Sequence, residues 1–181
     1  MPADIVSAAA AARSSIHVSP LSRLPEVAAA LGSFDLLSLL SPGLDADRGT
    51  VPAERHLHLT FHDVSESRSG LITPDRDMIA AILGFGRSAS AARPILIHCW
   101  AGISRSSAAA FILACDRHPG REQAIADELR RRAPFATPNP LMVALADDLL
   151  ACDGRMIGAI AAIGRGAEAF EGTPYELPLT F

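Results

Sequence analysis

One stretch of the chain, residues 94–113, places the tightest constraint on its fold. It begins with a short apolar run rich in β-branched residues, passes through a compact loop, and ends in an alanine-rich segment with helical spacing, PILIHCWAGISRSSAAAFIL. Short apolar runs of this kind favour buried strands, and the spacing of the last part favours a helix. The stretch therefore predicts a strand, a tight loop and the start of a helix, with the chemistry in the loop.

The loop between Cys99 and Arg105 predicts an anion-binding site. Five residues separate the two, and one of them is Gly102, so the loop can turn its backbone N–H groups inward at the start of a helix. The helix dipole, these N–H groups and the guanidinium all favour negative charge at one point, so a thiolate is expected to form readily on Cys99. Arg105 can bind two phosphate oxygens at once, which a lysine cannot do.

These residues resemble the signature of the cysteine-dependent protein tyrosine phosphatases. That signature is His-Cys, five residues with a central Gly, then Arg followed by Ser or Thr, and the chain matches it at His98, Cys99, Gly102, Arg105 and Ser106. The resemblance is to the compact, dual-specificity-like branch and covers about residues 56–150, with Asp63 near the end of a predicted strand and Asn139-Pro140 before a late helix. A buried cysteine that only fills the core is the structural alternative.

The resemblance implies a reaction that needs neither a metal nor another cofactor. Cys99 attacks phosphorus to form a cysteinyl-phosphate intermediate, Arg105 binds the transferring group, and Asp63 acts first as acid and then as base. Ser106 would hydrogen-bond the departing sulfur, and His98 would hold the loop in place from behind. Glu66 is the alternative acid. The substrate-binding residues implied in this way are Trp100, Ala101, Gly102, Ile103, Ser104 and Arg105.

The expected substrate is a phosphorylated protein or a small phosphoester, and phosphotyrosine fits the resemblance best. Residues 100–104 carry no positive charge, which favours a singly phosphorylated group; serine or threonine phosphate stays open. Trp100 either contacts a substrate ring or packs beneath the loop.

Two other functions compete with the phosphatase. One is a rhodanese-like sulfurtransferase, which Gly102 and the Arg105-Ser106 pair disfavour. The other is a catalytically weak phosphoprotein-binding module, which the presence of both Cys99 and Asp63 disfavours.

The order of apolar and helical patterns predicts an α/β fold, a three-layer α/β/α sandwich with a central, mostly parallel sheet, and the resemblance makes it tyrosine-phosphatase-like. One domain is expected over residues 1–181. Predicted strands cover residues 16–18, 35–40, 55–61 and 94–97. Outside the central stretch, helices are expected over 25–32, 74–85 with Thr73 as cap, 121–132 with Arg130 to Arg132 as a solvated end, 140–152 with Asn139 as cap, and 154–168. The remaining tail is expected to be extended.

The composition limits which binding partners and which cellular compartment are expected for this chain. The net charge of −4 is spread along the 181 residues, so neither nucleic acid nor an anionic membrane is expected as a partner. The alanine run 8–12 lacks a basic segment before it, and no signal peptide or membrane span is expected. Three cysteines suit a reducing cytoplasm. Cys115 is interpreted as a core residue, with redox regulation through Cys115 or Cys152 as the alternative, and the oligomeric state stays open.

One cluster of polar residues suggests a metal site only weakly. His56, His58 and His62 lie within seven residues at the end of a predicted strand. No cysteine or further carboxylate completes a recognisable ligand set around them. The histidines are therefore expected to face solvent or a helix, and no metal is predicted.

Overall fold

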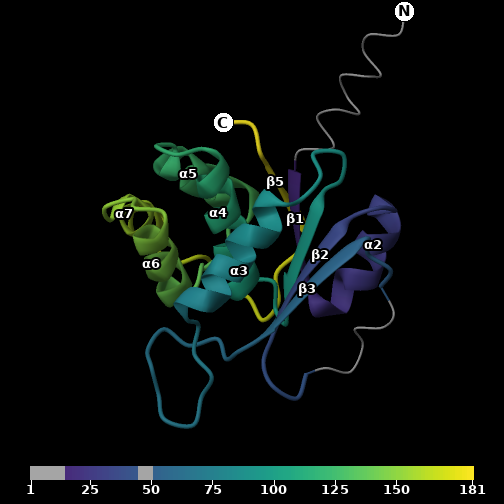
Figure 1. Ribbon diagram of the computed structural model, residues 1–181, viewed down its shortest axis with the longest axis horizontal. Coiled ribbons are helices and arrows are strands. Elements are labelled where there is room, and N and C mark those ends of the chain that lie inside the picture. Colours follow the sequence, from purple (N-terminus) through teal and green to yellow (C-terminus); the bar gives the residue numbers. More distant parts are fainter. Residues whose placement is uncertain (1–14, 45–50) are drawn as a thin grey trace, which may run out of the picture.

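The computed structural model describes residues 15–44 and 51–181, so the alanine run 8–12 and part of the predicted 41–53 loop lie outside the described residues. The chain forms an α/β fold around a mixed sheet of five strands in the order β3-β2-β4-β1-β5 (Figure 1). The strands β1, β2, β3 and β4 are parallel, and β5 is antiparallel to β1. Their bounds are Ser15–Pro20, Asp35–Leu40, Arg55–Thr60, Ile95–Cys99 and Tyr175–Pro178.

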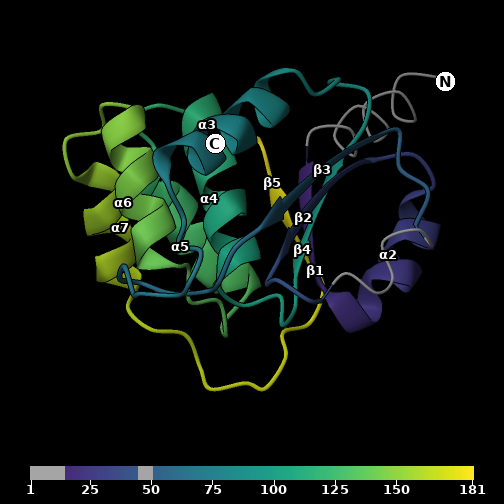
Figure 2. The same cartoon turned by 60° about the horizontal axis from the view of Figure 1, so that its bottom comes forward.

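Helices cover both faces of this sheet, which explains why the central strands are apolar on both sides. In β4, Ile95 and Ile97 belong to the larger hydrophobic cluster with most of the helices, whereas Leu96 belongs to the smaller cluster with helix α2. Alternation along a strand sends neighbouring side chains to opposite faces. Figure 2 shows α2 alone on one side and the other α-helices on the opposite side. Those helices are α3 (Arg76–Arg87), α4 (Arg105–Arg117), α5 (Glu122–Arg132), α6 (Pro140–Leu149) and α7 (Arg155–Ile163).

Most predicted elements are confirmed, and the central stretch forms the predicted strand, loop and helix. Helix α2 spans Leu24–Leu31 and follows a short 3₁₀ turn at Leu21–Arg23; Gly32 ends it, with a backbone φ of 73°. Asn139 caps α6 as predicted, because its side chain accepts a hydrogen bond from the N–H of Met142 at 3.0 Å. Pro140 occupies the first helical position, where no N–H is required. No helix in the described ranges is both long and apolar enough to cross a membrane.

The prediction that Thr73 caps the third helix was wrong. Helix α3 begins at Arg76, and Asp75 is its cap, with a side-chain oxygen that accepts from the N–H of Met78 at 2.8 Å. An aspartate is as good a cap as a threonine, so the helix can begin after the second of the two acceptors. The helix also continues to Arg87, beyond the predicted end at residue 85.

The C-terminal region departs most from the prediction. Helix α7 ends at Ile163 rather than near residue 168, and Gly164 follows it with a φ of 64°. The tail then forms β5, in which Tyr175 and Leu177 are buried. The Tyr175 hydroxyl donates to the Ser107 hydroxyl at 2.9 Å, which ties this edge strand to the first turn of α4.

Arg130 is not part of a solvated helix end, as the sequence predicted. Its guanidinium donates to the carbonyl oxygens of Pro134 at 2.6 Å, Ala136 at 2.9 Å and Gly164 at 2.7 Å. The two arginines that come after it pair instead with a glutamate of the same helix, Glu128. Arg130 therefore joins the segment after α5 to the segment after α7.

Candidate active site

The loop of residues 99–105 lies at the carboxyl ends of the parallel strands, where α/β folds place ligands. Gly102 has a φ of 70°, and a Cβ atom there would lie 2.8 Å from the backbone nitrogen of Pro20. Only glycine meets both conditions without strain. The N–H of Leu21 also donates to the carbonyl oxygen of Trp100 at 3.0 Å, so the end of β1 supports the loop from behind.

The sulfur of Cys99 lies inside this loop and has two polar neighbours. The N–H of Gly102 donates to it at 3.2 Å, and the hydroxyl of Ser106 lies 3.1 Å away. The residue is 2% exposed and directly precedes the loop that leads into α4. Hydrogen-bond donors and a helix N-terminus both stabilise negative charge on a sulfur, so this environment suits a thiolate nucleophile.

Arg105 begins α4, and its side chain is only 5% exposed. Its Nη1 donates to the carbonyl oxygen of Phe61 at 2.8 Å and to the Ser41 hydroxyl at 3.1 Å. Among the described residues and atoms, however, its buried Nε has no hydrogen-bond acceptor. A buried donor without a partner costs about 1–3 kcal/mol, and more when it is charged. An anion bound at this nitrogen would remove that cost.

Asp63 comes after β3 and is held in a fixed orientation from two sides. Its Oδ1 accepts from the Ser104 hydroxyl at 2.7 Å and from the Asn139 side-chain amide at 2.8 Å. Its Oδ2 lies 3.9 Å from Nε of Arg105. Because both donors bind Oδ1, a proton on this carboxyl group belongs on Oδ2, the oxygen nearer the arginine.

The contact between Asn139 and Asp63 was not predicted, although the sequence marked both residues. Asn139 is buried, its amide also donates to the carbonyl oxygen of Val64 at 3.1 Å, and its backbone N–H donates to the carbonyl oxygen of Ser104 at 3.3 Å. One residue thus caps α6, orients Asp63 and supports the loop. Helix capping was the only one of these roles that local sequence could reveal.

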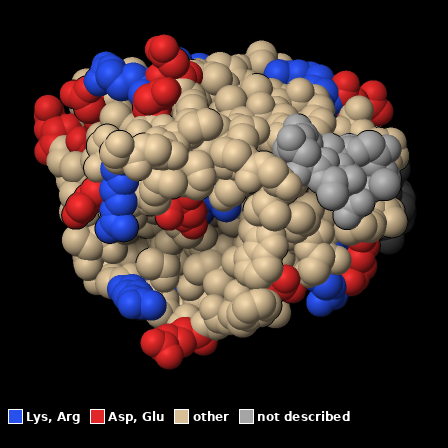
Figure 3. Space-filling view, turned by 90° about the horizontal axis from the view of Figure 1, so that it is seen from below, with Lys and Arg blue, Asp and Glu red and all other residues tan. Residues whose placement is uncertain are grey.

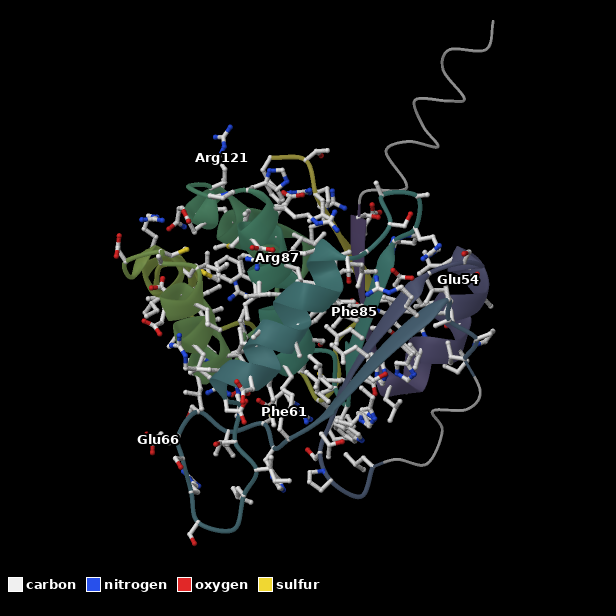
Figure 4. The ribbon with its side chains drawn as sticks, in the orientation of Figure 1. Glu54, Phe61, Glu66, Phe85, Arg87 and Arg121 are labelled. Atoms are coloured by element: carbon white, nitrogen blue, oxygen red, sulfur yellow. The ribbon has the colours of Figure 1, made fainter. Side chains whose placement is uncertain are left out.

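Glu66, the alternative acid, lies in a different place. Residues 62–72 form a loop closed at its base, where the N–H of Ile72 donates to Nδ1 of His62 at 3.0 Å. Figure 4 shows Glu66 on the outer part of this loop, with its side chain directed away from the body of the protein. Asp63 stands at the base of the same loop and contacts residues of the site, so the geometry favours Asp63.

His98 is buried behind the loop and bonds to a neighbouring strand. Its Nε2 lies 2.6 Å from the hydroxyl of Ser38, which in turn lies 2.8 Å from Nε2 of His56. Burial lowers the pKa of His98 to about 4, against a smaller opposing effect of the Cys99 backbone. A neutral imidazole with this environment supports the loop and is not a base in the site. The sequence signal for this partner was Ser38, a polar residue among the four leucines of β2.

The low pKa of His98 predicts a loss of stability in acid. The unfolded chain binds a proton on this histidine near pH 6.5, whereas the folded chain resists protonation down to about pH 4. Its contribution, up to about 3 kcal/mol, is therefore present above pH 6.5 and lost as the pH falls towards 4. Urea unfolding of wild type and His98→Asn across this range should show a flatter profile for the variant. Equal slopes in the two proteins would contradict the prediction.

Trp100 does not pack beneath the loop, which was one of the two predicted alternatives; its contact with a substrate ring stays a prediction. It is 40% exposed rather than buried beneath the loop, and its ring meets the ring of Phe170 edge to face at 5.4 Å. It lines a groove of about 380 Å³ together with Leu21, Leu24 and Pro25. Asp63 does not line that groove, so Trp100 and the predicted acid lie on different hollows.

A larger pocket of about 420 Å³ opens beside Asp63. Ile103 and Ser104 of the loop, Phe135 and Asn139, and residues 165–169 also line it. Figure 3 views the molecule from the side of loop 62–72 and shows a hollow on this face, with acidic and basic side chains together inside it. The loop, the predicted acid and the segment after α7 therefore share one depression.

The other polar residues that the sequence marked lie apart from this arrangement. The rings of His56 and His58 stack at 6.3 Å, and within residues 15–44 and 51–181 no group of three or more His, Cys, Asp or Glu side chains could hold a metal. Cys115 is buried ten residues beyond Arg105 on the same helix, hence about 15 Å along its axis. Burial raises the pKa of the Cys115 thiol, so both its place and its chemistry fit a core residue.

Four residues contribute to the site through contacts that the sequence did not predict: Ser38, Ser41, Phe61 and Asn139. Their common property is that they come from strands or loops far from residues 99–105 in sequence.

Comparisons of the chain with models of protein families, with curated proteins and with solved structures found no match.

Proposed function

We propose that this chain is a phosphomonoester hydrolase of the protein tyrosine phosphatase type, with the tyrosine-phosphatase-like three-layer architecture. One observation carries the proposal: the Cys99 sulfur, Nε of Arg105, which has no hydrogen-bond acceptor in the part of the chain that the structure describes, and the carboxyl group of Asp63 meet at one loop. The first is a nucleophile, the second an anion ligand and the third a proton donor. Together they supply the three functions that hydrolysis of a phosphate ester requires.

Substrate binding begins with the phosphate group in the loop. Nε of Arg105 donates to one phosphate oxygen, and the inward backbone N–H groups at the start of α4 donate to the others. Binding satisfies a buried donor for which residues 15–44 and 51–181 supply no hydrogen-bond acceptor, so part of the cost of desolvating the phosphate is offset. The contacts of Nη1 with Phe61 and Ser41 keep the guanidinium in this orientation.

The first chemical step transfers the phosphoryl group to Cys99. The thiolate forms the S–P bond while the bond from phosphorus to the leaving oxygen breaks, and the proton on Oδ2 of Asp63 passes to that oxygen. Charge that develops on the equatorial oxygens is met by Arg105 and the loop N–H groups. The products of this step are the free alcohol or phenol, cysteinyl phosphate and ionised Asp63.

The second step returns the enzyme to its starting state. Water attacks phosphorus, Asp63 takes one of its protons, and the S–P bond breaks to release inorganic phosphate. The hydroxyl of Ser106, 3.1 Å from the sulfur, donates to the departing thiolate. A sulfurtransferase or a phosphoprotein-binding module has no use for the oriented proton donor, and this favours the hydrolase over both alternatives.

Comparison of Asp63→Asn with Glu66→Gln tests the role of the acid. Asp63→Asn should lower kcat for tyrosyl or alkyl phosphates by about 10²–10⁴-fold, because these leaving groups require a proton. An aryl phosphate with an activated leaving group should lose less, and one limb of the pH–rate profile should disappear. Steady-state phosphate release from both substrate types measures the effect.

Glu66→Gln is the matched control, because it makes the same chemical change on the outer part of the same loop. It should retain activity on both substrates within about twofold. If Glu66→Gln loses the activity and Asp63→Asn retains it, the acid is Glu66. If pure wild-type protein releases no phosphate from any aryl phosphate, the hydrolase proposal is wrong.

A further inference from the structure

A series of hydrogen bonds links the exposed edge of the sheet to the residue before the nucleophile. It crosses three neighbouring strands, from His56 in β3 through Ser38 in β2 to His98 in β4. The Ser38 hydroxyl lies 2.8 Å from Nε2 of His56 and 2.6 Å from Nε2 of His98. His56 is exposed, whereas Ser38 and His98 are 0% and 1% exposed, so the series passes from solvent into the interior.

The strand register explains why these three side chains meet. Ser38 is the direct partner of His98 in β4. Leu36, two residues earlier in β2, is the partner of His56 in β3. Paired residues share a face of the sheet, and alternation puts residues 36 and 38 on the same face. All three side chains therefore lie on the face that α2 covers, and the other residues around the small space beside Ser38 and His98 are apolar.

The single hydroxyl hydrogen of Ser38 gives these hydrogen bonds a direction. A serine hydroxyl can donate to only one of the two ring nitrogens, so the other nitrogen donates to the serine oxygen. His98 is neutral, because burial lowers its pKa to about 4. The Cys99 backbone opposes this effect of burial on the pKa, as a carbonyl oxygen that accepts from the ring does. Since Nε2 is the nitrogen at Ser38, the hydrogen of the His98 ring belongs on Nδ1.

Nδ1 of His98 is the end of the series that lies at the nucleophile. It is buried, and within residues 15–44 and 51–181 it has no hydrogen bond of normal geometry. The Cys99 carbonyl oxygen is therefore a long or bent acceptor for it. With the hydrogen on Nδ1, the ring attracts this oxygen; with the hydrogen on Nε2, a lone pair would face the oxygen and repel it. The tautomer of His98 thus acts on the position of the Cys99 backbone.

We propose that Ser38 and His56 are positioning residues of the candidate active site, because they hold His98 in the tautomer with hydrogen on Nδ1. His56 donates from Nε2 to the Ser38 oxygen, and Ser38 donates to Nε2 of His98. This inference rests on the proposed function, since it takes Cys99 as the nucleophile. Loss of either donor should slow the reactions of the Cys99 sulfur and leave the anion site around Arg105 intact.

NMR signals of the histidine ring nitrogens test this direction without turnover. In the full chain with isotopically labelled histidine, ring nitrogens with and without hydrogen resonate far apart, and His98→Asn identifies the His98 signals by their absence. Wild type should show one tautomer, with hydrogen on Nδ1. Ser38→Ala removes the donor to Nε2, so a second tautomer of His98 should become detectable.

Ser15→Ala is the matched control for this change. It removes a buried serine hydroxyl that lies 3.1 Å from Nε2 of another histidine, His17, at the amino end of β1. The amino ends of the parallel strands lie opposite the loop of residues 99–105. The His98 signals of Ser15→Ala should therefore match those of wild type.

Alkylation of Cys99 by iodoacetamide, located by peptide mass mapping, tests the effect on the nucleophile. Ser38→Ala should slow alkylation about tenfold, because a small displacement of a reacting atom is costly. His56→Leu should slow it about threefold, since it removes the donor one step farther away. His56→Gln keeps an N–H donor in its side-chain amide and should restore the wild-type rate. His56 is exposed, so these two variants test the proposal if Ser38→Ala does not fold.

Two further comparisons separate positioning from a general loss of stability. If both residues act through one series of hydrogen bonds, Ser38→Ala combined with His56→Leu should react no more slowly than Ser38→Ala alone. Methylphosphonate should bind every variant within about twofold of wild type, because Arg105 and the loop N–H groups are unchanged. Fluorescence of Trp100, the single tryptophan of the chain, measures this binding.

The outcomes separate this inference from the proposed function. If wild-type His98 carries its hydrogen on Nε2, or if Ser38→Ala and His56→Leu are alkylated at the wild-type rate, Ser38 and His56 do not position Cys99. The hydrolase proposal would survive that result, because it requires neither Ser38 nor His56. If wild type releases no phosphate while the tautomer and the alkylation rate respond as expected, the hydrolase proposal is wrong and the hydrogen bonds still position Cys99.

Discussion

Cys99→Ser is expected to abolish turnover of every phosphate ester while it leaves phosphonate binding within about threefold of wild type. A serine hydroxyl does not ionise at neutral pH, so it cannot replace the thiolate as nucleophile. The Gly102 N–H and the Arg105 guanidinium remain in place, because the substitution exchanges one small buried group for another. Loss of kcat by about 10⁴-fold or more is expected, as when the nucleophile is removed from other covalent catalysts.

Cys152→Ser is the matched control for this change. Cys152 lies between α6 and α7, outside the candidate site, and the same atom is exchanged there. It should keep wild-type kcat and wild-type phosphonate affinity. Mass spectrometry of the quenched reaction should detect phosphate on the wild-type chain and none on Cys99→Ser. Turnover of an aryl phosphate by pure Cys99→Ser protein would show that Cys99 is not the nucleophile.

The parts of the site that local sequence could predict are those held by short-range structure. The strand β4, the loop and the start of α4 are continuous in the chain, and each has its own signal: a β-branched run, a glycine and an alanine-rich helix. Gly102 was marked in this way, but the reason for it is distant, since Pro20 at the end of β1 is what excludes a Cβ atom. A pattern can locate such a glycine without revealing what packs against it.

The contacts that orient the functional groups are long-range, and periodicity contains no information about them. Asn139 reaches Asp63 across 76 positions, and Arg105 reaches the Phe61 carbonyl across 44. The partner of each depends on how helices α4 and α6 pack against the sheet. Sequence could therefore predict the chemical identity of Asp63 and Arg105, but it could not predict which oxygen of Asp63 faces the arginine.

The path of residues 164–172, between α7 and β5, was missed for a related reason. Residues 154–168 have an apolar pattern with glycines, and the pattern alone favoured a longer helix. In the folded chain, Gly164 turns the backbone, and contacts with Arg130 and Thr137 hold residues 164–166 away from a helical path. Gly164 and Gly166 each disfavour a helix by about 1 kcal/mol relative to alanine, and the tertiary hydrogen bonds fix the path that the chain takes instead.

Arg105→Lys is expected to lower kcat/KM by about 10³-fold, nearly as much as loss of the nucleophile, although the positive charge is kept. The guanidinium uses Nη1 to bind the carbonyl oxygen of Phe61 and the Ser41 hydroxyl, and no group of the described residues accepts a hydrogen bond from its Nε. A lysine has one nitrogen and cannot occupy both positions. If the lysine nitrogen binds the carbonyl oxygen of Phe61, the phosphate loses its ligand. If the nitrogen binds the phosphate instead, the carbonyl oxygen of Phe61 loses its hydrogen-bond donor.

The split between kcat and KM distinguishes these effects from a simple loss of charge. A ligand that binds the transferring group more strongly in the transition state than in the substrate should lower kcat more than it raises KM. Arg121→Lys is the matched control: Figure 4 shows Arg121 at the opposite end of the molecule from Phe61, and it should retain full activity. Activity of Arg105→Lys within tenfold of wild type would mean that charge alone suffices, and the unpartnered Nε would then have no part in catalysis.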